Sequence, residues 1–441
     1  MKTELIYHQV ESFVDELDQN KRNYVVDPAR DHTRTRKISF KDCLMSSLCM
    51  SGGTLFSEVL EYYESRSSIP STSAFVQQRT KIKTSAFEKM FHMSSSLCNC
   101  KLYKGYRLLA VDGSDVRIPL NPSDLDTYCP GIHGQQPYNL LHLNAIYDLL
   151  SRSYVSAILQ GHNSCNEYDA AVKMVDSSDI LHTILIADRG YESYNLMAHC
   201  QEKGWKYVIR IKDCTSNGMA RKLGLKKHSK YDELINLKIT RKNSNYTKTL
   251  FNNFPNEYRY LPPSSRFDYL PKISKYKEDP VFYNLSFRIV QIEIQDGIYE
   301  TLVTNLDQSE FSSEELKILY RMRWGIETSF RTLKYNVGLL YTHSKCKRFI
   351  IQEIFARLTM YNIILAICSN VNLDNDGSKK YAYVVNVAHA VHICRKLFLH
   401  RLSPPQAEQL LSRSVVPVRN GRSFERRHGT RIAINLVYRV A

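Results

Sequence analysis

Hydrophobic and polar positions divide the chain into a helical beginning and a later series of strands. Residues 1–100 are mainly polar with helical spacing, and a serine-rich joint, SRSSIPSTSAF, interrupts them at Ser65–Phe75. After Pro70 the sequence is basic and amphipathic, a pattern typical of a helix-turn-helix DNA-binding element and equally of an ordinary helical hairpin. The pattern therefore predicts a helical N-terminal region that is a candidate for DNA binding.

From Tyr106 onward the spacing changes to that of strands. The run YRLLAVDGSDVRIP predicts a strand that ends at Asp112, and LLHLNAIYDLL with SYVSAILQ predicts a hairpin. Strands and helices then alternate: a helix from about Asn166 to Asp176, a buried strand at Thr183–Ala187, a helix around Ser193 to Lys203 and the strand WKYVIRI. This order predicts an α/β fold.

The stretch YRMRWGIETSFRTLKYNVGLL, residues 320–340, predicts one helix with two unlike faces. Ser312 and Glu315 form a capping box before it, and Gly338 is a suitable C-cap. At about 100° per residue, its polar positions fall within about 60° of one another, and an apolar stripe lies about 90° away. The polar stripe is either an exposed face with helical ion pairs or a face that lines a cleft. It consists of Tyr320, Arg323, Glu327 and Lys334.

Composition indicates a globular protein with a polyanionic partner. The 441 residues are 43% hydrophobic, and 60 basic against 44 acidic side chains give a net charge of +16 and a pI near 9.2. Basic residues concentrate in Arg221–Lys230 and in the tail from Arg395 to Arg439. Between residues 256 and 276, aromatic residues such as Tyr258 and Tyr260 lie among the charges, which suits phosphate contact with base stacking but also an edge hairpin with solvated lysines.

Cysteine usage favours a reducing compartment. The eleven cysteines include no CxxC pair, so we expect no structural zinc site. The N-terminal residues have no apolar core typical of a signal peptide, and the longest apolar run, YNIILAIC, is too short to cross a bilayer. A cytoplasmic protein without a membrane partner is therefore expected.

Three carboxylates are candidates for a metal site. Asp112 and Asp188 each follow a buried run, where a single aspartate is more often a turn former, and Glu327 lies on the helix. If all three converge at one sheet edge, they form the oxygen-ligand site that Mg²⁺ or Mn²⁺ prefers. Two such ions could activate an attacking hydroxyl and stabilise the leaving oxygen in displacement at phosphorus.

These residues resemble the signature of bacterial DDE transposases of the insertion-sequence-four type. The family's Tyr–Arg–Glu–Lys motif has 2, 3 and 6 intervening residues, which the helical stripe reproduces, and VDGSD, ADRGY and the helix carry the matching acidic residues. The resemblance implies cut-and-paste transposition by a dimer that holds two element ends, in a bacterial cytoplasm with nucleoid association. It also implies that Asp112, Asp188 and Glu327 bind two metal ions. It also implies DNA contacts by Tyr320, Arg323 and Lys334, and we add Arg189.

The resemblance also implies an architecture: a ribonuclease H-like α/β core interrupted by a β-rich insertion, with helical N-terminal and C-terminal regions. Asp188 and Glu327 are 139 residues apart, far more than one helix and a return connection need, and segments such as NLKITRK and FRIVQIEIQ alternate as strands do. The chain is expected to divide into a helical DNA-binding region (1–100), the first part of the core (101–212), the insertion (213–298), the end of the core with the catalytic helix (299–345), and a helical region with a basic tail (346–441). We expect the dimer interface in the last of these regions.

Several alternatives stay open at this stage. Members of this branch can stack a tryptophan of the insertion on a flipped base, but Trp205 and Trp324 lie outside the predicted insertion. Tyr258, Tyr260, Phe267 or Tyr269 could take that part. Asp115 and Glu192 are lower-ranked metal ligands. The protein could also be a ribonuclease H-like DNA nuclease without strand transfer, or a non-catalytic DNA-binding regulator.

Overall fold

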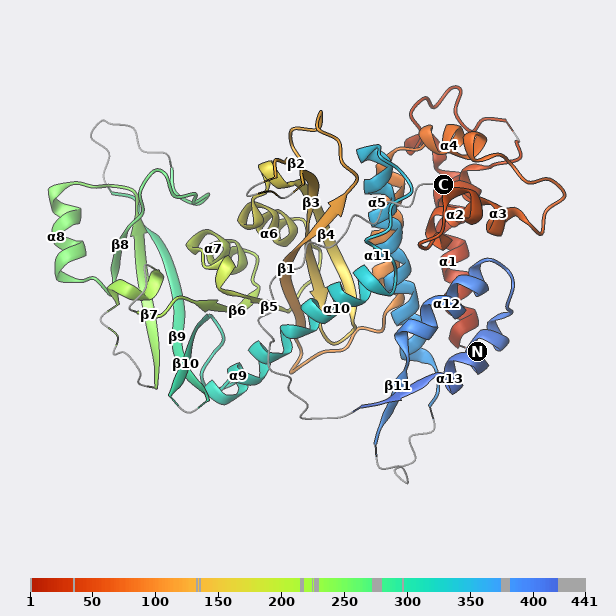
Figure 1. Ribbon diagram of the computed structural model, residues 1–441. Helices are drawn as coiled ribbons and strands as arrows, with labels where there is room; N and C mark the ends of the chain where they lie inside the picture. The colour runs from red at the N-terminus through yellow and green to blue at the C-terminus, as the bar shows by residue number, and fades with distance from the viewer. Residues whose placement is uncertain are drawn as a thin grey trace.

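The computed structural model describes residues 2–34, 36–131, 134, 136–214, 218–223, 225, 230–271, 280–295, 297–373 and 381–418. In this part of the chain a mixed α/β fold is built on one ten-stranded sheet, with a helical region at one end (Figure 1). The predicted basic tail falls largely outside the described residues.

The large sheet has a parallel centre and antiparallel flanks. Its order is β2-β3-β1-β5-β6-β10-β9-β7-β8, and β4 pairs with β3. β1, β5 and β6 are parallel, whereas β3, β4, β10 and β9 pair antiparallel to their neighbours. β7 pairs antiparallel to β9 and parallel to the edge strand β8. The strands are β1 (Arg107–Ile118), β2 (Tyr128–Cys129), β3 (Tyr138–Asp148), β4 (Ser153–Gly161), β5 (Thr183–Ala187), β6 (Lys206–Ile211), β7 (Tyr231–Thr240), β8 (Tyr258–Tyr260), β9 (Tyr283–Gln295) and β10 (Ile298–Thr304).

Both faces of the sheet centre are covered by helices, which explains why β5 is buried at every position and apolar from Ile184 to Ala187. Leu185 packs toward α6 (Glu167–Asp176) and α7 (Tyr194–Glu202), whereas Ile184 and Ile186 pack toward α9 (Ser313–Met322). From α9 the chain continues through α10 (Trp324–Tyr335), and the two helices run along the sheet from β10 toward the helical region (Figure 1).

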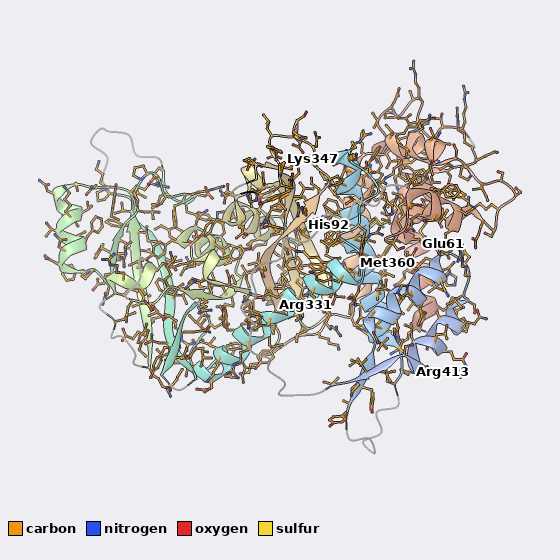
Figure 2. All side chains as sticks on the ribbon, viewed as in Figure 1. Glu61, His92, Arg331, Lys347, Met360 and Arg413 are labelled. Carbon is orange, nitrogen blue, oxygen red and sulfur yellow. The ribbon has the colours of Figure 1, made fainter. Side chains whose placement is uncertain are left out.

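A buried helix, α11 (Lys347–Asn370), forms the axis of the helical region. Figure 2 places its Met360 between the sheet and the outer helices, and this side chain is 2% exposed. The helices around it come from both ends of the chain: α1 (Lys2–Gln19), α2 (Phe40–Cys49), α3 (Leu55–Tyr63), α4 (Thr72–Thr80), α5 (Thr84–Ser94), α12 (Val387–Phe398) and α13 (Pro404–Arg413). A small sheet pairs β11 (Tyr383–Val385) with β12 (Val415–Pro417).

One expectation about this helical region needs correction. The apolar run at Tyr361 belongs to a 24-residue helix that is long and apolar enough to span a membrane by length and composition, although 94% of its apolar window is buried inside the protein. The expected dimer interface in residues 346–441 stays a prediction. Because α11 is enclosed by helices of its own chain, such an interface would use the other elements of that region, where Val384 and Leu410 are exposed.

Predicted elements of the sheet agree closely with the structure, with one exception. The helices and strands expected between Asn166 and Ile211 are present. Strand β1, however, does not end at Asp112, because residues 113–118 continue to pair with β3. Beyond the core, residues 231–295 supply β7, β8 and β9, which extend the same sheet, together with α8 (Asn245–Asn253).

Candidate active site

Asp112 and Asp188 lie side by side on neighbouring parallel strands. The last paired positions of β1 and β5 are Val111 and Ala187, and each aspartate is the next residue. Adjacent strands are about 4.8 Å apart. Pairing between β1 and β5 therefore ends where the two carboxylates begin, even though β1 itself continues. Asp188 then caps the short helical turn that follows, because its Oδ1 accepts the N–H of Gly190 over 2.7 Å.

Glu327 reaches this pair from α10, and Arg323 lies between the carboxylates. Nη2 of Arg323 donates a hydrogen bond of 2.8 Å to Oε1 of Glu327, and Nη1 lies 3.8 Å from Oδ2 of Asp112. Arg323 is only 6% exposed, and its buried Nε makes no hydrogen bond with the described part of the chain. Two carboxylates from different elements are thus held on one cation.

Electrostatics at Asp112 show that negative charge is concentrated here. Burial raises the pKa of Asp112 to about 6, and the charges of Asp188 and Glu327 act in the same direction. The N–H of Gly113 and the charge of Arg323 oppose the rise without cancelling it. Three acidic groups therefore repel one another, and one guanidinium only partly compensates them.

The donor set fits a divalent cation such as Mg²⁺ or Mn²⁺, which prefers carboxylate oxygens. Within the described residues, no three His, Cys, Asp or Glu side chains are already arranged to hold a metal ion. The position of Arg323 accounts for this, since its guanidinium occupies Glu327 and stands near Asp112. The site therefore has the negative charge and the oxygen atoms that a metal ion needs, and in this structure the guanidinium of Arg323 is the cation beside them.

Comparison with known proteins identifies the family. The family model described as "Transposase DDE domain" matches residues 103–363, more than half of the chain. This chain belongs to the transposase DDE domain family. It is also 22% identical, over 302 residues, to the transposase InsG for insertion sequence element IS4 of Escherichia coli (strain K12), an alignment that covers 66% of this chain and 60% of that relative. The family resemblance inferred from the sequence is confirmed.

A solved structure is also similar to this DDE-family chain. The cryo-EM structure of the piggyBac transposase synaptic complex with hairpin DNA matches it with a TM-score of 0.43 and 11% identity. That match covers 95% of this chain and 84% of the piggyBac chain.

The rest of the Tyr–Arg–Glu–Lys motif does not form one open face. The predicted single helix is two helices that meet at Arg323, so Tyr320 belongs to the packed face of α9 and is 5% exposed. Its ring lies 5.7 Å from the Arg323 guanidinium. Lys334, on α10, is half-buried. Burial lowers its pKa, and the opposing charge of Asp115 does not cancel this decrease. The predicted capping box at Ser312 is present.

Both lower-ranked metal ligands are engaged elsewhere. Oδ1 of Asp115 lies 2.8 Å from Nδ1 of His142, and this hydrogen bond lowers the pKa of Asp115. Glu192 accepts the backbone N–H groups of Lys212 over 2.9 Å and of Met219 over 2.5 Å. These contacts give both carboxylates structural roles.

Sequence reasoning missed a histidine beside the carboxylates. Nε2 of His142, on β3, lies 2.9 Å from Oε1 of Glu167, the first residue of α6. Burial opposes protonation of His142, but its hydrogen bond to Asp115 and its contact with the carboxylate of Glu167 raise its pKa to about 9. A Cβ at Gly113 would collide with Nε2 of His142 and lie 2.9 Å from Oε1 of Glu167. The signal in the sequence was the glycine directly after Asp112.

The predicted DNA contacts differ in how accessible they are. Arg189 is exposed, directly after Asp188. Tyr258 and Tyr260 are partly exposed, and the ring of Tyr258 contacts Phe282 and lies 5.4 Å from Nζ of Lys238. Phe267 is 3% exposed in the core and cannot offer a stacking face, which removes it from the stacking candidates.

Proposed function

We propose that this protein is a DNA transposase that moves an insertion sequence by cutting at terminal inverted repeats and joining the freed ends to target DNA. The observation that carries the proposal is the position of Arg323 between Glu327 and Asp112, with Asp188 next to Asp112 at the edge of parallel strands, within the region that matches the DDE domain. The match with the IS4 transposase supports the cut-and-paste class.

We further propose that β4, β3, β1, β5 and β6, with α6, α7 and α10, form a ribonuclease H-like core. The strand order and the helices on both sheet faces support it. The sequence-based division into five segments stands as part of this proposal, with residues 213–298 as the insertion. The N-terminal helices and α11 share one hydrophobic cluster, so the first and last segments would act as one unit.

In this mechanism Asp112, Asp188 and Glu327 hold Mg²⁺ or Mn²⁺, and we propose two ions. Bound ions would lower the pKa of a coordinated hydroxyl and stabilise charge on the leaving oxygen. The chain's own groups orient the DNA. Once Glu327 ligates metal, Arg323 is free to contact a phosphate through two N–H groups, and Lys334 offers a point charge beside it. Exposed Arg189 would contact the DNA backbone.

The partners we propose are double-stranded DNA, as element ends and as target, and a second copy of the chain. A net charge of +16 supports a polyanionic partner. All eleven cysteines, each in the described residues, are free thiols, which supports a reducing bacterial cytoplasm with nucleoid association.

One experiment separates this function from a nuclease and from a regulator. The DNA that flanks the coding region supplies the terminal repeats for a short linear substrate. With Mg²⁺, the protein should nick this substrate at the repeat end and then join that end to a supercoiled target plasmid. Cutting without joining would identify a nuclease. Binding without cutting, at any Mg²⁺ or Mn²⁺ concentration, would identify a regulator.

A further inference from the structure

A cavity of about 510 Å³ lies between the first turns of α6 and α7 and the segment that contains β8. Its walls come from these two turns, from Gly218 and Met219, and from β8 with the loop after it. The volume lies within the range of small-ligand sites, roughly 300–1,000 Å³. Ser193, which lines it, is five residues after Asp188 along the chain. The segment that carries Asp188 therefore leads directly into the wall of this cavity.

One wall holds a buried arginine whose guanidinium is only partly hydrogen-bonded. Arg259, in the middle of β8, is 9% exposed, and its Nε and Nη2 make no hydrogen bond with the described residues. Buried guanidinium N–H groups without acceptors are unfavourable unless an anion binds them. Tyr194 lines the same cavity, and its buried hydroxyl has no partner among the described residues either. Burial and the charge of Glu192 raise the pKa of Tyr194, and the charge of Arg259 opposes the rise, which indicates that Arg259 and Tyr194 are close.

Neither acidic side chain of the cavity forms an ion pair with Arg259 among the described residues. Glu192 accepts two backbone N–H groups, as described above, and keeps its negative charge in the lining. Asp169 forms an ion pair with Arg266, which also lies 3.2 Å from Asp268. Of the two arginines in the lining, Arg259 is therefore the one without an ionic partner in the described part of the chain.

The start of α7 adds a second feature that favours an anion. Ser193 is its N-cap but makes no side-chain capping hydrogen bond. The first turn of a helix carries N–H groups without intrahelical acceptors and the positive end of the helix dipole. Such a turn beside an arginine is a good phosphate site. The start of α6, in contrast, is capped by Asn166.

We propose that this cavity binds a backbone phosphate of the DNA strand that is cut at the carboxylates, with Arg259 as the principal contact. The inference rests on the proposed transposase function and adds to it a second anchoring point. One phosphate of the strand would lie at Asp112 and Asp188, and another would be held by Arg259 and the first turn of α7. The two contacts together would fix the direction in which the strand crosses the active site.

The test replaces single phosphates of the terminal-repeat DNA by neutral methylphosphonates at successive positions around the cut. The wild-type protein should lose about tenfold in affinity at one position. Arg259→Met should bind unmodified DNA about tenfold more weakly and should show no further loss at that position. Lys104→Met removes the same charge from an exposed ion pair with Glu315, ahead of β1, and should keep the wild-type profile. An Arg259→Met profile that retains the wild-type sensitivity overturns the proposal.

Thermal unfolding without DNA provides a second, independent readout. Removal of an unpaired buried charge should leave the melting temperature of Arg259→Met equal to or above that of the wild type. A large decrease, or failure to fold, would make Arg259 a structural arginine and contradict the proposal. Inorganic phosphate that stabilises the wild type, without any methylphosphonate effect, would assign the cavity to a free anion. If the wild type itself neither binds nor cuts the DNA, the proposed function fails instead.

Discussion

Arg323 donates a 2.8 Å hydrogen bond to Glu327, so the third carboxylate of the site is bound to a cation of the protein itself. The other terminal nitrogen of Arg323 lies 3.8 Å from Asp112. A divalent ion between these carboxylates would compete with the guanidinium for Glu327. Metal binding and release of Arg323 toward DNA are therefore expected to be coupled.

Replacement of Arg323 tests this coupling. Arg323→Ala should bind Mn²⁺ as tightly as the wild type or several-fold more tightly, while DNA cleavage falls by about 10–100-fold. Arg323→Lys should recover only part of the cleavage, because a point charge cannot make two parallel hydrogen bonds. Calorimetric titration with Mn²⁺ measures the metal affinity, and a cleavage assay measures the rate of DNA cutting. If Mn²⁺ binding is lost together with cleavage, Arg323 supports the metal site instead of competing with it.

Asp188→Asn should separate catalysis from DNA binding. The amide keeps an acceptor for the N–H of Gly190 but loses the negative charge that a metal needs. Cleavage should fall by more than about 100-fold, whereas affinity for the element end should stay within about threefold, because most of it comes from phosphate contacts elsewhere. Asp15→Asn, at an exposed ion pair on α1, is the control and should cleave normally. A cleavage-competent Asp188→Asn protein would contradict the triad.

Local patterns predicted the sheet elements because those elements are governed by periodicity and burial. Thr183–Ala187 is buried at every position, and apolar after Thr183, since helices cover both faces, and the structure has the strand at these residues. The predicted end of β1 was wrong because Asp112 and Gly113 resemble a turn, whereas in the structure the strand continues to Ile118 through its pairing with β3. A partner strand, which no local window contains, decides that boundary.

The site was predictable as a set of residues and not as an arrangement. Helical spacing correctly placed Tyr320 beside Arg323, but it could not show that both side chains are buried by packing against the sheet. The contact of His142 with Glu167 joins a strand to a helix, and only the fold brings them together. Long-range contacts of this kind leave little trace in a single sequence.

The His142 cluster predicts a pH dependence of stability. The pKa of His142 is raised from 6.5 to about 9, so the folded state favours the protonated imidazole. Its contribution is complete below pH 6.5 and is lost as the pH rises through 9. Because Asp115 and Glu167 are 52% and 39% exposed, screening reduces the effect to about 1–2 kcal/mol. Urea unfolding at pH 6.5 and 9.5 should show this decrease in the free energy of unfolding for the wild type and a smaller decrease for His142→Asn. An equal decrease in both proteins would contradict the prediction.

A buried ion pair fixes α4 to α11 and predicts a large cost when it is broken. Nη1 of Arg79 lies 3.0 Å from Oε1 of Glu353, and the two side chains are 3% and 2% exposed. Burial opposes ionisation of Glu353, yet the charge of Arg79 and hydrogen bonds from His343 hold its pKa at about 2. Arg79 is thus committed to the core and is not a DNA contact of the proposed helix-turn-helix.

Arg79→Met alone should lower the free energy of unfolding by about 3–5 kcal/mol, because it leaves a buried carboxylate without its partner. The double variant Arg79→Met, Glu353→Met should recover a large part of that loss, since neither charge remains buried. Arg66→Met is the matched control: its partner is Asp42, but Arg66 is 41% exposed, so about 1 kcal/mol or less should be lost. Urea denaturation of all three variants measures these differences. A double variant that is less stable than Arg79→Met would contradict this prediction. It would show that removing the unpaired carboxylate does not restore stability, and that packing around α11 depends on both charged side chains.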